Sequence, residues 1–81
     1  MLDLYILESC PYCKKVMDYC KTNSIKFHKF DIINKDNLEK LTLLGGKEQV
    51  PFLYNEETQE KLYESEEIIN YLEKILKNNK K

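Results

Sequence analysis

The sequence lacks several features that would place it in a large class of proteins. No apolar run approaches the length of a membrane span, and no cationic, hydrophobic leader follows Met1. Its 13 basic and 14 acidic side chains leave a net charge of −1, so neither nucleic acid nor an anionic membrane is an expected partner. With 81 residues and three cysteines, the chain is too short for a second domain and cannot pair all its thiols internally. We therefore expect one cytoplasmic domain, residues 1–81, that acts as a monomer.

The chain does contain a Cys-x-x-Cys motif, Cys10-Pro11-Tyr12-Cys13, between a predicted strand at residues 2–7 and a predicted helix. Pro11 suits the first helical position, because it has no N–H to leave unpaired and its φ is already helical. Four residues recur at helical spacing and should form the buried stripe of this helix: Cys13, Val16, Met17 and Cys20. Cys10 should therefore lie at or beside the N-cap with its sulfur exposed, above a buried Cys13.

This arrangement favours reversible dithiol chemistry. The free N–H groups and the positive end of the helix dipole stabilise an anion at a helix start, and thiols placed there ionise more readily than a free thiol. Cβ atoms three residues apart lie about 5–6 Å from each other, close enough for a disulfide after a rotamer change. The sequence predicts Cys10 as the nucleophilic thiolate and Cys13 as the thiol that resolves a mixed disulfide. The alternative, that both are merely small core residues, does not account for the Pro-Tyr insert between them.

A structural zinc site is the other interpretation of these thiols, since Cys10, Cys13, Cys20 and His28 are four possible ligands. Cys13 and Cys20 would lie roughly 10 Å apart along one helix. The ligands of a tetrahedral zinc ion must lie within about 4 Å of one another. We therefore expect no metal, and we expect Cys20 to be a buried core thiol and His28 a polar residue on a strand.

The remaining pattern predicts the order β-α-β-α-β-β-α. After the strand at residues 2–7 and a helix at about residues 12–22, we expect a strand at 26–33, a helix at 34–44 that ends at Gly45-Gly46, strands at 50–54 and 59–63 joined by a turn, and a last helix capped by Ser65. The opening β-α-β unit should be right-handed with parallel strands.

Three features together resemble the glutaredoxin family across nearly the whole chain: the Cys-Pro-Tyr-Cys motif after the first strand, Val50-Pro51 at the third strand, and an acidic-serine segment at the start of the last helix. Residues 64–72 are also similar to the corresponding part of glutathione transferase amino-terminal domains, which share the fold. The resemblance implies an α/β, thioredoxin-like fold with a central four-stranded mixed sheet flanked by helices. It also implies a glutaredoxin-type enzyme that uses glutathione as co-substrate to reduce disulfide-containing and glutathionylated proteins.

The resemblance further implies where glutathione binds. Seven residues are implied to contact it: Tyr12, Gln49, Val50, Pro51, Glu64, Ser65 and Glu66. In glutaredoxins the proline matching Pro51 is cis, which leaves the backbone of Val50 free to pair with the peptide part of glutathione. The γ-glutamyl end is implied to lie at the last helix, where free N–H groups suit a carboxylate and an acidic side chain suits an ammonium. Ser65 and the glutamates are equally suited to helix capping alone.

One departure from the family pattern leaves the reductant open. Glutaredoxins commonly carry a lysine three residues before the first active-site cysteine, and here that position is Leu7, followed by Glu8. A negative charge near the sulfur opposes thiolate formation, and Lys14, Lys15 and Lys47 are the other candidate sources of positive charge. This departure favours one alternative, a thioredoxin-like electron carrier reduced by a flavoprotein. A separate alternative is a module that binds an iron–sulfur cluster through Cys10 and glutathione.

Overall fold

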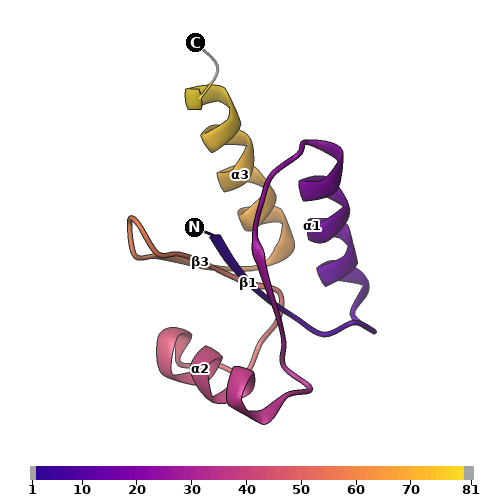
Figure 1. Cartoon of the computed structure of the whole chain (residues 1–81), viewed down its shortest axis with the longest axis vertical. Coiled ribbons are helices and arrows are strands. Elements are labelled where there is room, and N and C mark those ends of the chain that lie inside the picture. Colours follow the sequence, from indigo (N-terminus) through magenta and orange to yellow (C-terminus); the bar gives the residue numbers. More distant parts are fainter. Residues whose placement is uncertain (1, 80–81) are drawn as a thin grey trace.

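The computed structural model describes residues 2–79, and the elements follow the expected order (Figure 1). Their bounds are β1 Leu2–Ile6, α1 Pro11–Thr22, β2 His28–Asp31, α2 Lys35–Gly45, β3 Phe52–Asn55, β4 Glu60–Tyr63 and α3 Ser65–Asn79. The predicted domain of residues 1–81 also includes Met1, Lys80 and Lys81, which lie outside the described residues. Within residues 2–79, no helix combines the length and the hydropathy that crossing a membrane requires.

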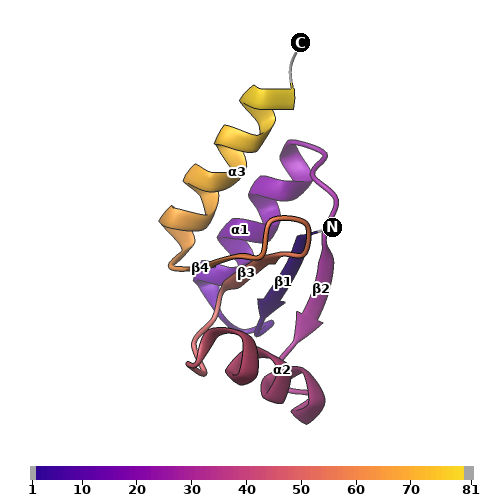
Figure 2. The same ribbon diagram turned by 90° about the vertical axis from the view of Figure 1, so that its left-hand side faces the viewer.

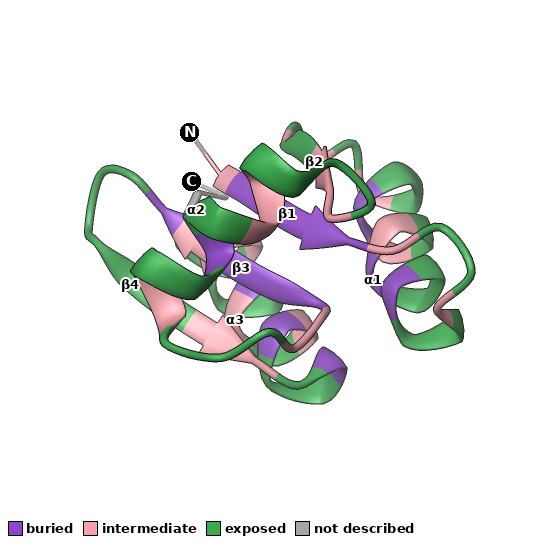
Figure 3. Ribbon diagram, turned by 90° about the horizontal axis from the view of Figure 1, so that it is seen from below, coloured by how far each residue is buried: buried purple, intermediate pink, exposed green. Residues whose placement is uncertain are grey.

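The four strands form one mixed sheet in the order β2-β1-β3-β4. β1 pairs in parallel with β2 and antiparallel with β3, and β3 pairs antiparallel with β4. α1 and α3 lie side by side on one face of the sheet, and α2 lies on the other (Figures 1 and 2). The central strands β1 and β3 are largely buried, whereas the edge strands β2 and β4 are more exposed (Figure 3). The expected mixed sheet flanked by helices is confirmed.

Alternate residues of β1 point to opposite faces of the sheet, and each face has its own apolar core. The larger core, under α1 and α3, consists of Leu4, Ile6, Cys13, Val16, Cys20, Leu53, Ile68 and Leu72. The smaller core, under α2, consists of Tyr5, Leu41 and Phe52. Burying each large apolar side chain stabilises the fold by about 1.5–3 kcal/mol, whereas helices of this length are marginal in isolation. Packing on the sheet therefore holds α1 in place, with Cys13 on its inner side.

The second strand is shorter than predicted. β2 covers His28–Asp31 rather than residues 26–33, and Ile33 is 81% exposed. The Ile33 N–H donates to the Asp31 carboxylate at 3.0 Å, which turns the chain immediately after the strand. The apolar pair Ile32 and Ile33 favoured a longer strand, but this side-chain hydrogen bond ends it.

The predicted stop of α2 is confirmed, whereas the predicted cap of α3 is wrong. Gly46 has a φ of 80° at the C-cap of α2, and its N–H donates to the Thr42 carbonyl at 2.8 Å. Ser65 is the first residue of α3 rather than its N-cap. The carbonyl of Glu64 accepts the N–H of Ile68 at 3.0 Å, so Glu64 holds the capping position, with a φ of 69°.

Candidate active site

Cys10 lies at the N-cap of α1, as predicted from Pro11. Its backbone is extended, with φ −84° and ψ 118°, and its carbonyl accepts the N–H of Lys14 at 3.1 Å. The Cys10 N–H donates to the Leu7 carbonyl at 2.9 Å, which fixes the turn between β1 and α1. Cys10 makes no side-chain capping hydrogen bond and is half-buried. Its sulfur is therefore partly accessible at the end of α1 where the helix dipole favours an anion.

Cys13 is buried beneath Cys10 and has no exposed surface. Burial raises the pKa of the Cys13 thiol to about 12; a backbone hydrogen bond with Leu7 opposes this shift, whereas the Cys10 sulfur and Asp31 add to it. Both cysteines are free thiols. At neutral pH Cys13 therefore keeps its proton within hydrogen-bonding reach of Cys10. One accessible sulfur beside one buried, protonated thiol is the asymmetry that a dithiol exchange site needs.

A cavity of about 550 Å³ opens beside the first turn of α1, between the segment before β3 and the start of α3. Its lining contains all seven residues that the sequence implied as glutathione contacts, together with Glu67: Tyr12, Gln49, Val50, Pro51, Glu64, Ser65, Glu66 and Glu67. The volume falls within the 300–1,000 Å³ range of small-molecule sites. Cys10 is not in the lining, but it lies two residues before Tyr12.

The cavity walls come from three separate parts of the chain. Tyr12, on α1, is 63% exposed, so its ring is available to a ligand. The Val50–Pro51 peptide bond is cis, as the family resemblance implied. The Gln49 amide donates to the Glu64 carboxylate at 3.1 Å. Gln49, one of the implied glutathione contacts, thus already bonds to the start of α3 across the cavity.

The cavity is acidic. Three carboxylates line it, those of Glu64, Glu66 and Glu67, and no lysine or arginine appears in its lining within the described part of the chain. Lys47, one of the cations considered from the sequence, lies with its Nζ 5.4 Å from the centre of the Tyr63 ring. The site therefore suits the cationic end of a ligand and offers its anionic end mainly the N-terminus of α3.

The charge of Glu8 is compensated, which the sequence did not reveal. Its carboxylate forms an ion pair with Lys29 of β2 at 3.0 Å, although the two residues are 21 positions apart. Lys14 and Lys15 are exposed on α1. The carboxylate expected to oppose ionisation of Cys10 is thus partly neutralised by β2.

Glu67 and Cys20 also lie in or near the site. Glu67 lines the cavity although sequence reasoning did not select it; its place beside Glu66 in the first turn of α3 was the available signal. Cys20 is 2% exposed, and burial raises the pKa of its thiol to about 11. The prediction that Cys20 is a core thiol is confirmed.

Comparison with known proteins agrees with this geometry. Residues 4–80 match the family described as glutathione S-transferase, N-terminal domain. The chain is 31% identical over 74 residues to glutaredoxin 2 of Escherichia coli K12, covering 91% of this chain and 34% of that protein. It thus spans about a third of the length of the curated relatives it matches.

Solved structures with the same fold also match this chain. Glutaredoxin 2 of Salmonella typhimurium, crystallised in complex with glutathione, is 26% identical, with a TM-score of 0.75 over 89% of this chain and 32% of that one. A thioredoxin-like protein is 19% identical, with a TM-score of 0.79 over 94% of this chain and 99% of that one. The thioredoxin-like fold is therefore confirmed. The chain belongs to the family of glutathione S-transferase N-terminal domains, as a glutaredoxin-like domain with a Cys10–Cys13 pair at the start of its first helix.

Proposed function

We propose that the protein is a glutathione-dependent thiol–disulfide oxidoreductase of the glutaredoxin type that acts as a monomer. The observation that carries the proposal is the half-exposed Cys10 at the N-cap of α1, directly above a buried Cys13 that stays protonated. The adjacent cavity, lined by the residues implied as glutathione contacts, supports glutathione as the co-substrate. The relative solved in complex with glutathione adds to this support.

The first step is an exchange at Cys10. The Cys10 thiolate attacks the glutathione sulfur of a glutathionylated protein, a bond forms between these two sulfurs, and the protein's own sulfur leaves as a thiolate that takes up a proton from water. The N-terminus of α1 stabilises the attacking anion, and Lys29 partly compensates the charge of Glu8 in the loop between β1 and α1. The product is a mixed disulfide between Cys10 and glutathione.

The second step can follow two routes. A second glutathione thiolate attacks the glutathione sulfur of the mixed disulfide, which releases oxidised glutathione and restores the Cys10 thiolate. Alternatively, the Cys13 sulfur attacks the Cys10 sulfur, and the glutathione sulfur leaves as a thiolate that takes up the Cys13 proton. Two further glutathione molecules then reduce the Cys10–Cys13 disulfide and leave as oxidised glutathione. A thiol whose pKa is about 12 is ionised to only about one part in 100,000 at neutral pH. We therefore infer that free glutathione resolves the mixed disulfide between Cys10 and glutathione, and that Cys13 resolves the mixed disulfide that Cys10 forms with one sulfur of a protein disulfide.

The cavity lining supports a specific orientation of glutathione. The γ-glutamyl carboxylate would lie at the free N–H groups of α3, with Ser65 and Glu66 in the first turn, and the γ-glutamyl ammonium would lie near Glu64 and Glu66. The backbone of Val50 would pair with the cysteinyl part. To accept the ammonium fully, Glu64 would exchange its bond with Gln49 for one with the ligand.

A second candidate function is a thioredoxin-like carrier reduced by a flavoprotein. It is favoured by one observation: Leu7 replaces the usual lysine, and the described lining of the cavity has no cation for the glycyl carboxylate of glutathione. Such a carrier would use the same two sulfurs but would require Cys13 in every turnover.

One assay pair separates these functions. The purified chain is supplied with the glutathione mixed disulfide of a short peptide, and turnover is followed with glutathione plus glutathione reductase, or with thioredoxin reductase. We expect activity with glutathione, a loss of about a thousandfold or more in Cys10→Ser, and at least about a tenth of it retained in Cys13→Ser.

Cys20→Ser is the matched control, because it removes a third thiol that has no access to substrate. Circular dichroism establishes that each variant is folded. Turnover by Cys10→Ser would refute Cys10 as the nucleophile. Activity with thioredoxin reductase alone would replace the leading function with the second one.

A further inference from the structure

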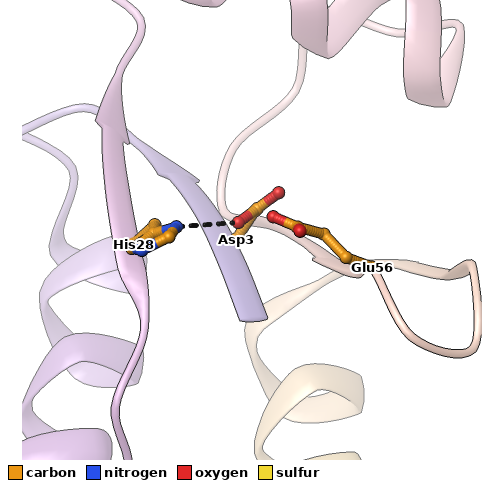
Figure 4. A group of neighbouring side chains, drawn as sticks. All are labelled: Asp3, His28 and Glu56. Atoms are coloured by element: carbon orange, nitrogen blue, oxygen red, sulfur yellow. Dashed lines mark ion pairs between the residues drawn. The ribbon is translucent and has the colours of Figure 1, made fainter. Parts of the chain in front are cut away.

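A polar cluster lies at the end of the sheet opposite to Cys10. Its members are Asp3 near the start of β1, His28 at the start of β2, and Glu56 immediately after β3 (Figure 4). Asp3 and His28 are register partners on neighbouring parallel strands, so their side chains lie on the same face of the sheet. The carboxylate of Glu56 faces that of Asp3 from the other side (Figure 4). Three distant parts of the sequence thus bring one imidazole and two carboxylates together.

The Asp3 side chain is the most informative member of the cluster. It is only 9% exposed, and its Oδ1 is buried without a hydrogen-bond donor among the described residues. A buried carboxylate oxygen without a hydrogen-bond donor is destabilising, and such atoms in native proteins usually indicate a missing partner. His28 Nδ1 forms only a long ion pair with Oδ1, at 3.5 Å, and the second carboxylate comes from Glu56. Burial and the neighbouring Glu56 carboxylate raise the pKa of Asp3 to about 6, although His28 opposes the shift. A cation at the centre of the cluster would satisfy all three groups.

The spacing of the three groups suits a small divalent ion. One ligand atom from each residue lies within 4.8 Å of the other two, and the separation between Asp3 and His28 is 3.5 Å. Ligands about 2.0–2.2 Å from a tetrahedral zinc ion are about 3.3–3.6 Å apart. The distance between the Asp3 and His28 ligand atoms therefore already fits, and the distances to the Glu56 carboxylate must shorten by up to about 1 Å. Glu56 is exposed in the turn after β3, so its flexible side chain can make that movement.

We propose that Asp3, His28 and Glu56 bind a zinc ion through one imidazole nitrogen and two carboxylate oxygens, with water in the fourth position. The nitrogen ligand favours zinc over magnesium and calcium, which prefer oxygen ligands alone. Cys20 and the dithiol take no part, because Cys10 follows the opposite end of β1 and Cys20 lies on α1 in the larger core. The bound ion links β1, β2 and the turn after β3, so it stabilises the sheet.

The experiment must separate this site from the thiols, which also bind zinc. Co²⁺ serves as the probe and is titrated into the Cys10→Ser/Cys13→Ser chain at pH 7.5. Oxygen and nitrogen ligands give only weak visible bands, whereas thiolate ligands add strong near-ultraviolet charge-transfer bands. His28 is the single histidine of the chain, so its ring signals in NMR spectra report the same event during a Zn²⁺ titration.

We expect saturable binding of one ion, perturbed His28 ring signals and no charge-transfer band. His28→Gln and Glu56→Gln, two exposed positions whose substitution should leave the fold intact, should each weaken binding at least about tenfold. Glu73→Gln, an exposed glutamate on α3, is the matched control and should bind like the parent chain. The absence of saturable binding, a thiolate spectrum, or equal binding by the His28 and Glu56 variants would each overturn the proposal.

Discussion

Glu64 has a φ of 69°, a left-handed backbone conformation that a residue with a Cβ adopts at a cost of about 1–2 kcal/mol. The same residue lines the cavity, and its carboxylate accepts a hydrogen bond from Gln49. Backbone strain and a proposed ligand contact therefore coincide at the start of α3. Strain retained at such a position is typical of functional sites, where the surrounding structure holds an unfavourable conformation in place.

Two substitutions at Glu64 separate the strain from the carboxylate. Glu64→Gly and Glu64→Ala both remove the hydrogen bond with Gln49, but only glycine adopts this φ without strain. We expect Glu64→Gly to have a free energy of unfolding about 1 kcal/mol higher than Glu64→Ala, measured by urea denaturation. Both variants should lose glutathione affinity to a similar degree. Equal stabilities would show that the backbone at residue 64 relaxes.

Because of Cys20, the free energy of unfolding depends on pH in the alkaline range. Burial raises the pKa of its thiol from the ordinary value of 9.0 to about 11 in the folded chain. Between these values the folded chain holds a proton that the unfolded chain has released. The stability gained from this difference is fully present below pH 9 and is lost as the pH rises through 11. Cys13 acts in the same direction, with its pKa raised to about 12.

Cys20→Ala removes this contribution. We expect the variant to be less stable at pH 8 by about 1–2 kcal/mol, because a buried side chain is truncated. Its free energy of unfolding should then fall by about 2 kcal/mol less than that of the parent between pH 8 and pH 11. Urea denaturation of both chains under reducing conditions measures the difference, in which the titration of tyrosines and lysines cancels. Parallel pH profiles would contradict the assignment.

The end of α2 is packed against β4 so closely that only glycine fits at position 45. A Cβ built on Gly45 would meet the hydroxyl of Tyr63, and would lie 2.8 Å from Cζ of that ring and 3.1 Å from Cε1 of Phe52. Tyr63 is held in place, because its hydroxyl donates to the Lys47 carbonyl at 3.0 Å and accepts the Lys47 N–H at 3.2 Å. The contact between helix and strand therefore depends on the missing side chain.

Gly45→Ala should destabilise the chain by about 1–3 kcal/mol through overpacking. Gly46→Ala is the control: a Cβ there has nothing within 4 Å, and only its φ of 80° makes the substitution costly, by about 1 kcal/mol. In a Tyr63→Phe background the cost at Gly45 should decrease, while the cost at Gly46 stays the same. Thermal and urea unfolding of the five variants measure both. A cost at Gly45 that is insensitive to Tyr63 would refute the proposed clash.

The elements could be predicted because their signals are local. Pro11 marks the start of α1 and Gly46 the end of α2, since each acts through its own backbone conformation. The predicted end of β2 and the predicted start of α3 were wrong, because both are set by hydrogen bonds that a pattern of apolar residues does not reveal. Asp31 ends β2 by accepting the N–H of Ile33, and Glu64 rather than Ser65 accepts the first backbone bond of α3.

The contacts within the sites could likewise be predicted only where the residues are close in sequence. Cys10 and Cys13 are three residues apart on one helix, so helical geometry alone predicts their order of exposure. The bond between Gln49 and Glu64 and the ion pair between Glu8 and Lys29 join residues 15 and 21 positions apart. Only the strand register brings such residues together. Asp3, His28 and Glu56 are equally distant in the sequence, so no local pattern indicates that their side chains lie together.

The molecule as a whole is nearly neutral, with a net charge of −1, but its charges are unevenly placed around the cavity. Glu64, Glu66 and Glu67 line the cavity, and its described lining contains no lysine or arginine. Surface charges act over about 10 Å at 0.1 M salt, which is comparable to the dimensions of the cavity. A charged molecule that enters the cavity therefore meets a negative field, although the net charge of the protein is small.

This field should select substrates by charge. We expect kcat/KM for a glutathione mixed disulfide of a peptide with flanking lysines to exceed that for the matched peptide with flanking glutamates, by about fivefold at 20 mM salt. The ratio should approach one at 300 mM salt, because the charges are then screened. Glu67→Gln, which removes one cavity carboxylate, should narrow the ratio at low salt, and Glu73→Gln on α3 should leave it unchanged. A ratio that does not respond to salt would mean that shape, and not the acidic cavity, sets the preference.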